Sequence, residues 1–303
     1  MADDRDSGSG IVRFRIAQRS ATPLMRKISC RVPDILATAM RICTWNVGGL
    51  KGGIQRVHPW LRGNQPDIVG LQEAKTDDPQ SVVSAFRSEG YHCELHMDPD
   101  DKGWIPGVAI LSRQPLKVTQ VGLPGQEDRG ARLLTASTAG LSFTTVCVPS
   151  ASGKGQRRIE RKLAWLDSLT EHLRERGTDD EPAVLCGDFN ITPKSIDNYH
   201  HWENTKERKN RPGFREDERS RISSLLEAGW FDLVRDLNPD ERMFSWWWSP
   251  DYYDRDKGLR MDLMFGNAAV VRRLRSARID RGHYADRGRT GKPDHAPVVV
   301  DLA

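Results

Sequence analysis

Several short apolar segments of this sequence end in polar side chains that could support metal-dependent chemistry. A carboxylate that directly follows a buried strand is costly to remove from water, so it is usually exposed, paired or bound to a metal ion. Because Mg²⁺ prefers oxygen ligands, strand ends that converge on carboxylates and amides predict a site for a hard cation. Five segments end in this way, at Asn46, at Glu73, at Asp188 with Asn190, at Asp262, and at Asp294 with His295.

A mixture of strands and helices must bring these side chains together. Apolar runs predict strands over Met40–Asn46, Asp67–Gln72, Gly107–Ser112, Arg132–Ser137, Leu141–Val148, Ala183–Cys186, Arg260–Phe265 and Pro297–Leu302. Helical spacing predicts helices over Ile54–Arg62, Ser81–Ser88, Gln156–Arg174 and Ser220–Ala228. We expect Gly187 to stop the strand before Asp188, and Asp197–Arg219 to form a polar surface excursion. Because helices fall between only some of the strands, the pattern favours two packed sheets with helices outside over repeated βαβ units.

The overall charge gives little support to a nucleic-acid partner. The chain has 303 residues with 46 Lys and Arg against 42 Asp and Glu, a net charge of +4. Residues 1–39 contain seven basic and four acidic residues, so this segment supplies +3 and the remaining chain only +1. No apolar run approaches the roughly 18 residues of a membrane span, which excludes an integral membrane protein.

The first 39 residues differ from the rest of the chain. They begin with acidic and small residues and then become rich in Arg and Ser without a period, which predicts a disordered tail or an over-extended gene start. A transit peptide is an alternative, although Asp3, Asp4 and Asp6 argue against it. Five scattered cysteines without a CxxC pair favour a reducing, cytoplasmic setting. The sequence shows no apolar region of a signal peptide, so we do not expect a secreted protein. We expect residues 40–303 to form one catalytic domain.

Seven motifs between Met40 and Leu302 resemble those of the exonuclease III type of apurinic/apyrimidinic endonucleases, in the endonuclease/exonuclease/phosphatase superfamily. In order they are TWNVGGL, PDIVGLQEAK, GVAILSR, CGDFNITP, FSWWW, GLRMDLM and KPDHAPV. Each motif alone is weak, but their combined order is specific. The resemblance implies a four-layer α/β sandwich, with two packed mixed β-sheets flanked by helices.

The same resemblance implies a metal site on oxygen ligands. Glu73 is then the principal metal carboxylate, with Asn46 beside it and Asp294 close enough to help. Asp188 and Asn190 are possible ligands of a second ion, and the number of ions stays open between one and two. The implied cofactor is Mg²⁺, with Mn²⁺ as a possible substitute.

Catalytic roles follow from the resemblance for four residues. Asp188 would orient and deprotonate the attacking water, and Asn190 would donate a hydrogen bond to a phosphate oxygen. His295 would also contact the phosphate and would be oriented by Asp262. These residue types suit phosphodiester hydrolysis, because a general base and hydrogen-bond donors act where charge moves in the transition state.

Substrate contacts are implied for a second group of residues. Trp246, Leu259 and Met261 correspond to a pocket for a flipped abasic sugar, and Arg132 to an arginine near DNA. We expect Trp247 and Trp248 to serve packing. Cys147 stands where the family usually has a tyrosine of the active site, so a hydroxyl that contacts phosphate is missing. Two basic clusters could also contact phosphates or form ordinary solvated faces: Lys154, Arg157, Arg158, Arg161 and Lys162, and then Lys206, Arg208, Lys209 and Arg211.

These expectations together predict a metal-dependent phosphodiester hydrolase in DNA base excision repair. It would cleave DNA 5′ to abasic sites, remove nucleotides or blocking groups from 3′ ends, or do both. One alternative is a phosphoesterase of the same superfamily with a non-DNA substrate, and another is a catalytically silent DNA-binding homologue. We expect DNA as the partner, a monomer, no membrane association, and a cytoplasmic location that is nucleoid-associated if the source is bacterial.

Overall fold

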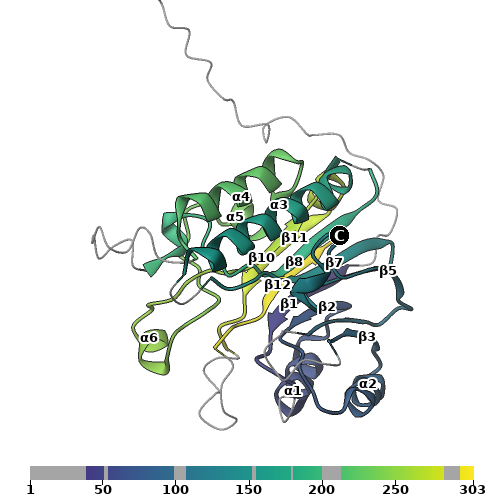
Figure 1. The fold of residues 1–303 in the computed structure, drawn as a ribbon. Helices are drawn as coiled ribbons and strands as arrows, with labels where there is room; N and C mark the ends of the chain where they lie inside the picture. The colour runs from purple at the N-terminus through teal and green to yellow at the C-terminus, as the bar shows by residue number, and fades with distance from the viewer. Residues whose placement is uncertain are drawn as a thin grey trace, which may run out of the picture. The chain divides into compact units, whose positions relative to one another are not determined.

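The structure is a computed structural model that describes residues 39–50, 54–98, 107–151, 155–178, 180–199, 213–282 and 294–303 (Figure 1). The predicted tail over residues 1–39 lies outside this part of the chain except for its last residue. Lys154 and the basic cluster that contains Lys206, Arg208, Lys209 and Arg211 also lie outside it. Thr38–Ala303 form one unit, and the account below concerns its described residues.

The first sheet has six strands in the order β11-β12-β1-β2-β4-β3. Its strands are β1 Met40–Asn46, β2 Ile68–Gln72, β3 His92–His96, β4 Val108–Ser112, β11 Leu274–Ile279 and β12 Val298–Leu302. Only β1 and β2 pair in parallel, with Asn46 opposite Gln72. The carboxyl ends of these two strands therefore meet at one edge, which brings Asn46 and Glu73 together.

The second sheet repeats this design with six strands in the order β5-β6-β7-β8-β10-β9. Its strands are β5 Lys117–Val121, β6 Leu133–Thr138, β7 Leu141–Cys147, β8 Ala183–Asp188, β9 Phe231–Asp232 and β10 Asp262–Gly266. β7 and β8 are its parallel pair, with Cys147 opposite Asp188. On the other side of β8, the antiparallel strand β10 places Asp262 opposite Asp188.

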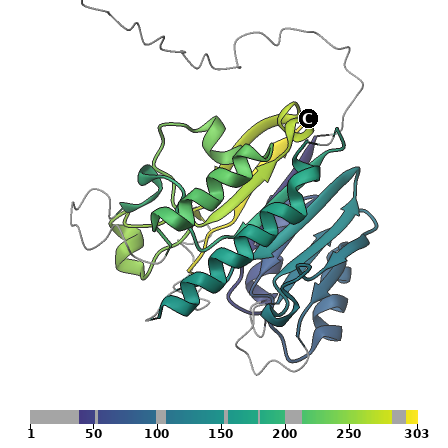
Figure 2. The same cartoon turned by 45° about the horizontal axis from the view of Figure 1, so that its top comes forward.

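Helices cover the outer face of each sheet (Figures 1 and 2). An apolar core fills the space between the two sheets. The helices α1 Ile54–Asn64 and α2 Pro79–Ser88 pack on the first sheet, while α3 Gln156–Thr178 and α4 Glu216–Glu227 lie side by side on the second. This arrangement confirms the predicted four-layer α/β sandwich. Shorter elements are α5 Leu233–Leu237, α6 Pro250–Asp254, α7 Ala268–Val271 and the 3₁₀ turns Glu127–Arg129 and Ser195–Asp197.

Sequence periodicity accounts for the main elements of these layers. β1 buries its last five residues, as expected for an apolar strand inside a sheet, and α3 buries Ile159, Leu166 and Leu169 on one face. Leu163, which has the same helical spacing, is only half-buried. No helix in the described ranges is long and apolar enough to cross a membrane.

Two predictions about local structure were wrong. Gly187 does not stop β8, which continues to Asp188; a Cβ at Gly187 would collide with the carbonyl oxygen of Val146, so the glycine lets β7 approach closely. Asp197 is fully buried rather than part of a surface excursion, because it pairs with buried arginines. Arg219, at the far end of the predicted excursion, belongs to α4.

Four strands escaped the sequence analysis: the two-residue strand β9, and three others that lack a continuous apolar run. β3, β5 and β11 are short strands rich in polar residues, and β5 alternates between exposed and half-buried positions. All three lie on the edges of the two sheets. Edge strands of this kind face water on more sides, so their composition resembles that of loops.

Candidate active site

Asp188 is the centre of the candidate site. It is the last residue of β8 and is only 2% exposed. The side-chain nitrogen Nδ2 of Asn46 donates to its Oδ2 at 3.0 Å. Asn190 donates twice to the same carboxylate, from its backbone N–H to Oδ1 at 2.8 Å and from its Nδ2 to Oδ2 at 3.2 Å. Residues from both sheets thus hold the carboxylate of Asp188 in place at the strand ends.

A buried aspartate–histidine pair lies beside Asp188. Oδ2 of Asp262 is 2.8 Å from Nδ1 of His295, and Nε2 of His295 faces Oδ2 of Asp188 at 4.0 Å. Burial is the largest single influence on the pKa of His295 and lowers it, but the charge and hydrogen bond of Asp262, together with the charges of Asp188 and Asp294, outweigh burial and raise that pKa to about 10. Burial also raises the pKa of Asp188 to about 6, although His295 opposes this shift. The imidazolium therefore presents an N–H donor at Nε2 toward the space beside Asp188.

Glu73 and Asn46 form the second half of the site, at the ends of the parallel strands β1 and β2. Nδ2 of Asn46 lies 3.3 Å from Oε1 of Glu73, so this amide bridges Glu73 and Asp188. The other amide atom, Oδ1, accepts a hydrogen bond from the backbone N–H of Gly48 at 3.0 Å. Nζ of Lys75 lies 3.8 Å from Oε2 of Glu73.

These donors suit a hard cation in their chemistry. The carboxylates of Glu73 and Asp188 share the amide NH₂ group of Asn46 as a hydrogen-bond donor. This group carries only a partial positive charge, so a divalent cation would neutralise the two carboxylates more completely than the amide does. Binding would require Asn46 to turn its oxygen toward the ion. Within the described ranges, no three His, Cys, Asp or Glu side chains group closely enough to hold a metal by themselves. A cation here would thus depend on amide oxygens and water in addition to the carboxylates.

Apolar side chains adjoin this polar centre. Trp246 and Leu259 form an isolated bridge through reciprocal backbone hydrogen bonds of 2.9 Å, and both side chains are half-buried. The ring of Trp246 is 6.4 Å from that of His295, and its Nε1 donates to Oδ2 of Asp294 at 3.2 Å. Met261 is 8% exposed and immediately precedes Asp262. The structure therefore brings the three predicted pocket residues to the side of the polar centre.

Comparison with known proteins identifies the family. The sequence profile described as "Endonuclease/Exonuclease/phosphatase family" matches residues 43–291. The chain belongs to this family. The match and the fold together confirm the predicted resemblance and the hydrolytic enzyme class, and members of the family depend on divalent metal ions.

Relatives of this endonuclease/exonuclease/phosphatase protein include DNA nucleases. An exodeoxyribonuclease from Bacillus subtilis is 29% identical over 86% of this chain and 98% of its own length. The DNA repair nuclease APEX1 of Danio rerio is 30% identical over 89% of this chain and 84% of its own. Among solved structures, a 3′ phosphatase from Neisseria bound to product DNA hairpin has a TM-score of 0.77, with 29% identity over 87% of this chain and 99% of that one.

The remaining predicted residues of this family member occupy varied places. Arg132 is half-buried; its Nε donates to the carbonyl of Arg129 at 2.9 Å and its Nη1 to that of Cys147 at 3.1 Å, which ties it to backbone at the margin of the site. Asp294 accepts a hydrogen bond from Trp246, and its role as a metal ligand stays a prediction. Cys147 is 3% exposed, and burial raises the pKa of its thiol well above the usual range, so a neutral thiol lies next to Asp188.

The three consecutive tryptophans of this family member lie in three environments. Trp247 is fully buried and packs against Tyr253 with ring centres 5.0 Å apart, so the packing role predicted for it agrees with its position. Trp248 is 72% exposed, so the prediction of a packing residue was wrong there. Its ring meets that of Trp246 edge-on at 5.9 Å. An exposed indole therefore lies against Trp246, next to the polar centre.

Sequence analysis missed two residues, Arg260 and Ser245, that hold the segment with Leu259, Met261 and Asp262 in place. Arg260, between the two apolar pocket residues, is fully buried and binds Asp197 and Asp232. The hydroxyl oxygen of Ser245 accepts the backbone N–H groups of Met261 and Asp262, both at 3.1 Å. The sequence did contain a signal for Arg260, because this charged residue is flanked by apolar residues at the start of a predicted strand. That pattern is compatible with a buried ion pair and equally with a side chain that faces solvent, so it does not decide between them.

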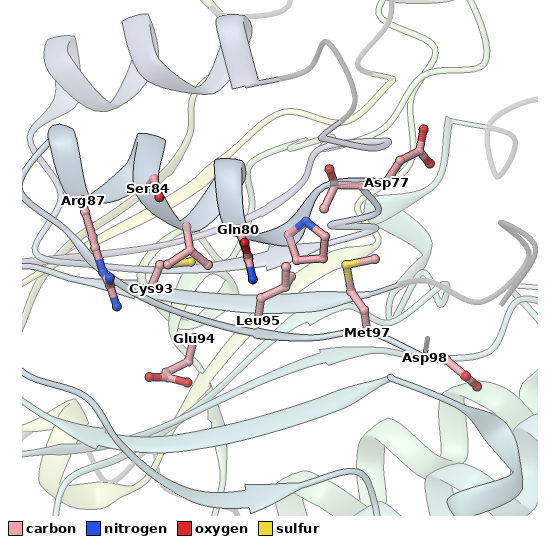
Figure 3. Close-up of a pocket in the computed structure, with 12 residues that line it drawn as sticks. Asp77, Gln80, Ser84, Arg87, Cys93, Glu94, Leu95, Met97 and Asp98 are labelled. Atoms are coloured by element: carbon pink, nitrogen blue, oxygen red, sulfur yellow. The ribbon is translucent and has the colours of Figure 1, made fainter. Parts of the chain in front are cut away.

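A separate groove lies away from these residues. It has a volume of about 980 Å³ and runs between α2 and the edge strand β3 (Figure 3). Figure 3 shows Arg87 and Ser84 on α2, with Glu94, Leu95 and Met97 on or next to β3. None of the predicted catalytic, metal or pocket residues lines it. The candidate active site is therefore defined by the converging strand ends rather than by this hollow.

Proposed function

We propose that this family member is a DNA repair nuclease that hydrolyses the phosphodiester 5′ to abasic sites, removes nucleotides or blocking groups from 3′ ends, or does both. The observation that carries the proposal is the setting of Asp188, a buried carboxylate bonded by Asn46 and Asn190 and faced by His295. The DNA substrate is supported by the relatives named above, which are DNA nucleases.

In this proposal each polar residue has a separate task. Asp188 orients a water molecule and accepts its proton, because its raised pKa makes it a better base than an ordinary aspartate. Asn190 and the Nε2–H of His295 donate to phosphate oxygens as negative charge grows on them. Asp262 fixes the ring of His295 through Nδ1, so that Nε2 stays directed toward the reacting group.

Mg²⁺ is the proposed cofactor, with Mn²⁺ as a substitute and one or two ions. Glu73 and Asn46 would hold it, Asp294 would assist, and Asp188 and Asn190 are candidates for a second ion. When bound, such an ion neutralises charge on the phosphate and on the leaving oxygen. The oxygen-only character of this donor set supports a hard ion over a softer metal.

Trp246, Leu259 and Met261 are proposed to receive the deoxyribose of an abasic nucleotide. An apolar wall suits a sugar without a base, while a normal nucleotide would have to place its base in the same space. Arg132 is proposed to lie near the DNA backbone. The exposed arginines of α3, which are Arg157, Arg158 and Arg161, are further candidates for phosphate contacts. Lys162 of the same predicted cluster is buried and is not one of them.

We also propose a cytoplasmic monomer. Support comes from Cys43, Cys93, Cys147 and Cys186, which are buried free thiols in the described ranges and suit a reducing compartment. Size-exclusion chromatography with light scattering tests the monomer. A mass twice that of the chain would contradict it.

Removal of divalent metal should abolish incision of a duplex that contains one abasic analogue. The physical reason is that the phosphodiester repels a hydroxide nucleophile unless its charge is neutralised. Gel analysis of a labelled strand with EDTA, and then with excess Mg²⁺ or Mn²⁺, measures this. Undiminished incision in EDTA would contradict a metal-dependent reaction.

The matched variants are Glu73→Gln and Glu181→Gln. Glu73→Gln should raise the Mg²⁺ concentration for half-maximal activity, because it removes a charged oxygen ligand, whereas Glu181 is an exposed acid whose change should have no effect. Cleavage of small phosphodiesters without incision of DNA would favour a non-DNA substrate. Binding of the duplex without any cleavage would favour a silent homologue.

Trp248→Ala should weaken DNA binding without a large change in kcat. An aromatic side chain that stacks on a nucleobase contributes about 1–3 kcal/mol, which is roughly a fivefold to hundredfold change in affinity. Fluorescence anisotropy in EDTA, where cleavage is prevented, measures the dissociation constant. Trp248→Phe should retain most of the affinity, and Leu226→Ala, at an exposed position of α4, should retain all of it. Equal affinities for Trp248→Ala and wild type would contradict the contact.

A further inference from the structure

Lys162 is a fully buried cation that no catalytic role described above uses. It lies in the second turn of α3, and its side chain is 0% exposed. A buried ammonium group is tolerated only when it is paired and hydrogen-bonded. Its partners therefore indicate what the charge is for.

The ammonium group joins three parts of the chain. Nζ donates to Oε1 of Glu218 at 2.6 Å and to the backbone carbonyl of Asn190 at 2.7 Å. The second oxygen of Glu218, Oε2, accepts the backbone N–H of Gly213 at 2.7 Å and that of Arg215 at 3.2 Å. The pair thus connects α3, the start of α4 and the turn that follows β8.

The turn after β8 needs such support because of its backbone. Asn190 has φ of +52°, in the left-handed region that L residues other than glycine adopt at a cost. Both groups that Asn190 offers to Asp188, its N–H and its side-chain Nδ2, depend on that conformation. Rotation of the Asn190 peptide units would withdraw these donors from Asp188. A hydrogen bond to the Asn190 carbonyl opposes the rotation.

A second contact closes the same turn from the other side. The backbone N–H of Thr192 donates to the carbonyl of Gly213 at 2.7 Å, and Gly213 itself has φ of +89°. A Cβ at Gly213 would come within 3.1 Å of the Asn190 carbonyl oxygen. Asn190 is therefore confined between Lys162 on α3 and the backbone at Gly213.

We propose that Lys162 is a positioning residue for the hydrolytic reaction, which acts through the Asn190 carbonyl and is kept neutralised by Glu218. The inference rests on the proposed function, because it assigns Lys162 to the same site. Lys162 touches neither phosphate nor metal. Its contribution is to fix the orientation in which Asn190 serves Asp188 and the phosphate.

The test is the double variant Lys162→Met/Glu218→Gln. The single change Lys162→Met would leave the Glu218 charge buried and unpaired, which destabilises the fold for reasons unrelated to catalysis. The double variant removes both charges, while the amide oxygen introduced by Glu218→Gln still accepts the N–H groups near Gly213. We expect kcat for abasic-site incision to fall about tenfold to hundredfold with KM changed less than twofold, since small misplacements of a reacting group have effects of this size.

The matched control is Leu173→Ala, a core substitution in the same helix. Leu173 is fully buried, and its loss should lower the melting temperature without a change in kcat per folded molecule. Glu218→Gln alone should keep more of kcat than the double variant, because Lys162 can still donate to Asn190. A folded double variant with a wild-type kcat would overturn the proposal.

A further variant covers failure of the double variant to fold. Lys162→Arg keeps the charge and the pair, but a planar guanidinium cannot reproduce the single-point approach to the Asn190 carbonyl. We expect at least a threefold lower kcat at an unchanged KM, and a wild-type kcat in this variant would then overturn the proposal. If wild type incises no DNA but cleaves another phosphodiester, the proposed substrate is wrong, and the same variants test Lys162 on that phosphodiester.

Discussion

Asp188→Asn should lower kcat for abasic-site incision by about 10²- to 10⁴-fold, the range expected when a general base is lost. The amide has the same shape as the carboxylate, and its oxygen can still accept the N–H of Asn190. The amide cannot take up a proton, and it lacks the negative charge that faces His295. Single-turnover incision of a labelled abasic duplex at saturating Mg²⁺ measures the effect.

Three further measurements decide the meaning of that loss. The melting temperature of Asp188→Asn should stay at or above that of wild type, because the change removes a desolvated charge next to Asp262. DNA affinity in EDTA should also be retained. Asp167→Asn, an exposed carboxylate of α3, is the control and should incise at the wild-type rate. A kcat of Asp188→Asn within threefold of wild type would contradict the assignment of the base.

Arg260→Met should lower the free energy of unfolding by about 3–5 kcal/mol, the usual cost of breaking a fully buried ion pair. Arg260 binds Asp197 through Nε at 2.7 Å and Asp232 through Nη2 at 2.8 Å, and it is 0% exposed. Arg235 is the second cation of the cluster and also binds Asp197. Removal of Arg260 leaves one buried negative charge without compensation. Urea unfolding followed by circular dichroism measures the change.

Arg278→Met is the matched control for this prediction. Arg278 pairs with Asp301 at 3.3 Å but is 42% exposed, so its loss should cost less than about 1 kcal/mol. Equal losses for Arg260→Met and Arg278→Met would contradict the view that burial decides the effect. Because Arg260 lies between Leu259 and Met261, the remaining folded protein should also show a raised KM for the abasic duplex.

Much of the site could be predicted because its residues follow strands. Asn46, Glu73, Asp188 and Asp262 each come at the end or start of an apolar segment, and the parallel pairs β1/β2 and β7/β8 bring such positions to one edge. The fold followed from the same segments. How these residues act is still a prediction, since position alone does not reveal the chemistry they perform.

The buried charges could not be predicted, because a sequence shows residue types but not their partners. Asp197 lies in a polar stretch, and its partner Arg260 is 63 positions away. Lys162 belongs to a basic run whose other described members are exposed. The three consecutive tryptophans make the same point: they are chemically identical, and tertiary packing alone leaves Trp247 buried and Trp248 exposed.

The division of the site between two sheets has a consequence for how the protein acquires activity. The hydrogen bond from Asn46 to Asp188 spans 142 residues of chain, and that from the Trp45 ring to the His295 carbonyl spans 250. Contacts of such long range form late, since the chain must close large loops before they gain any stabilisation. Neither half of the polypeptide carries a complete site. We therefore expect the proposed site to be complete during synthesis only after β12 has joined the first sheet beside β1.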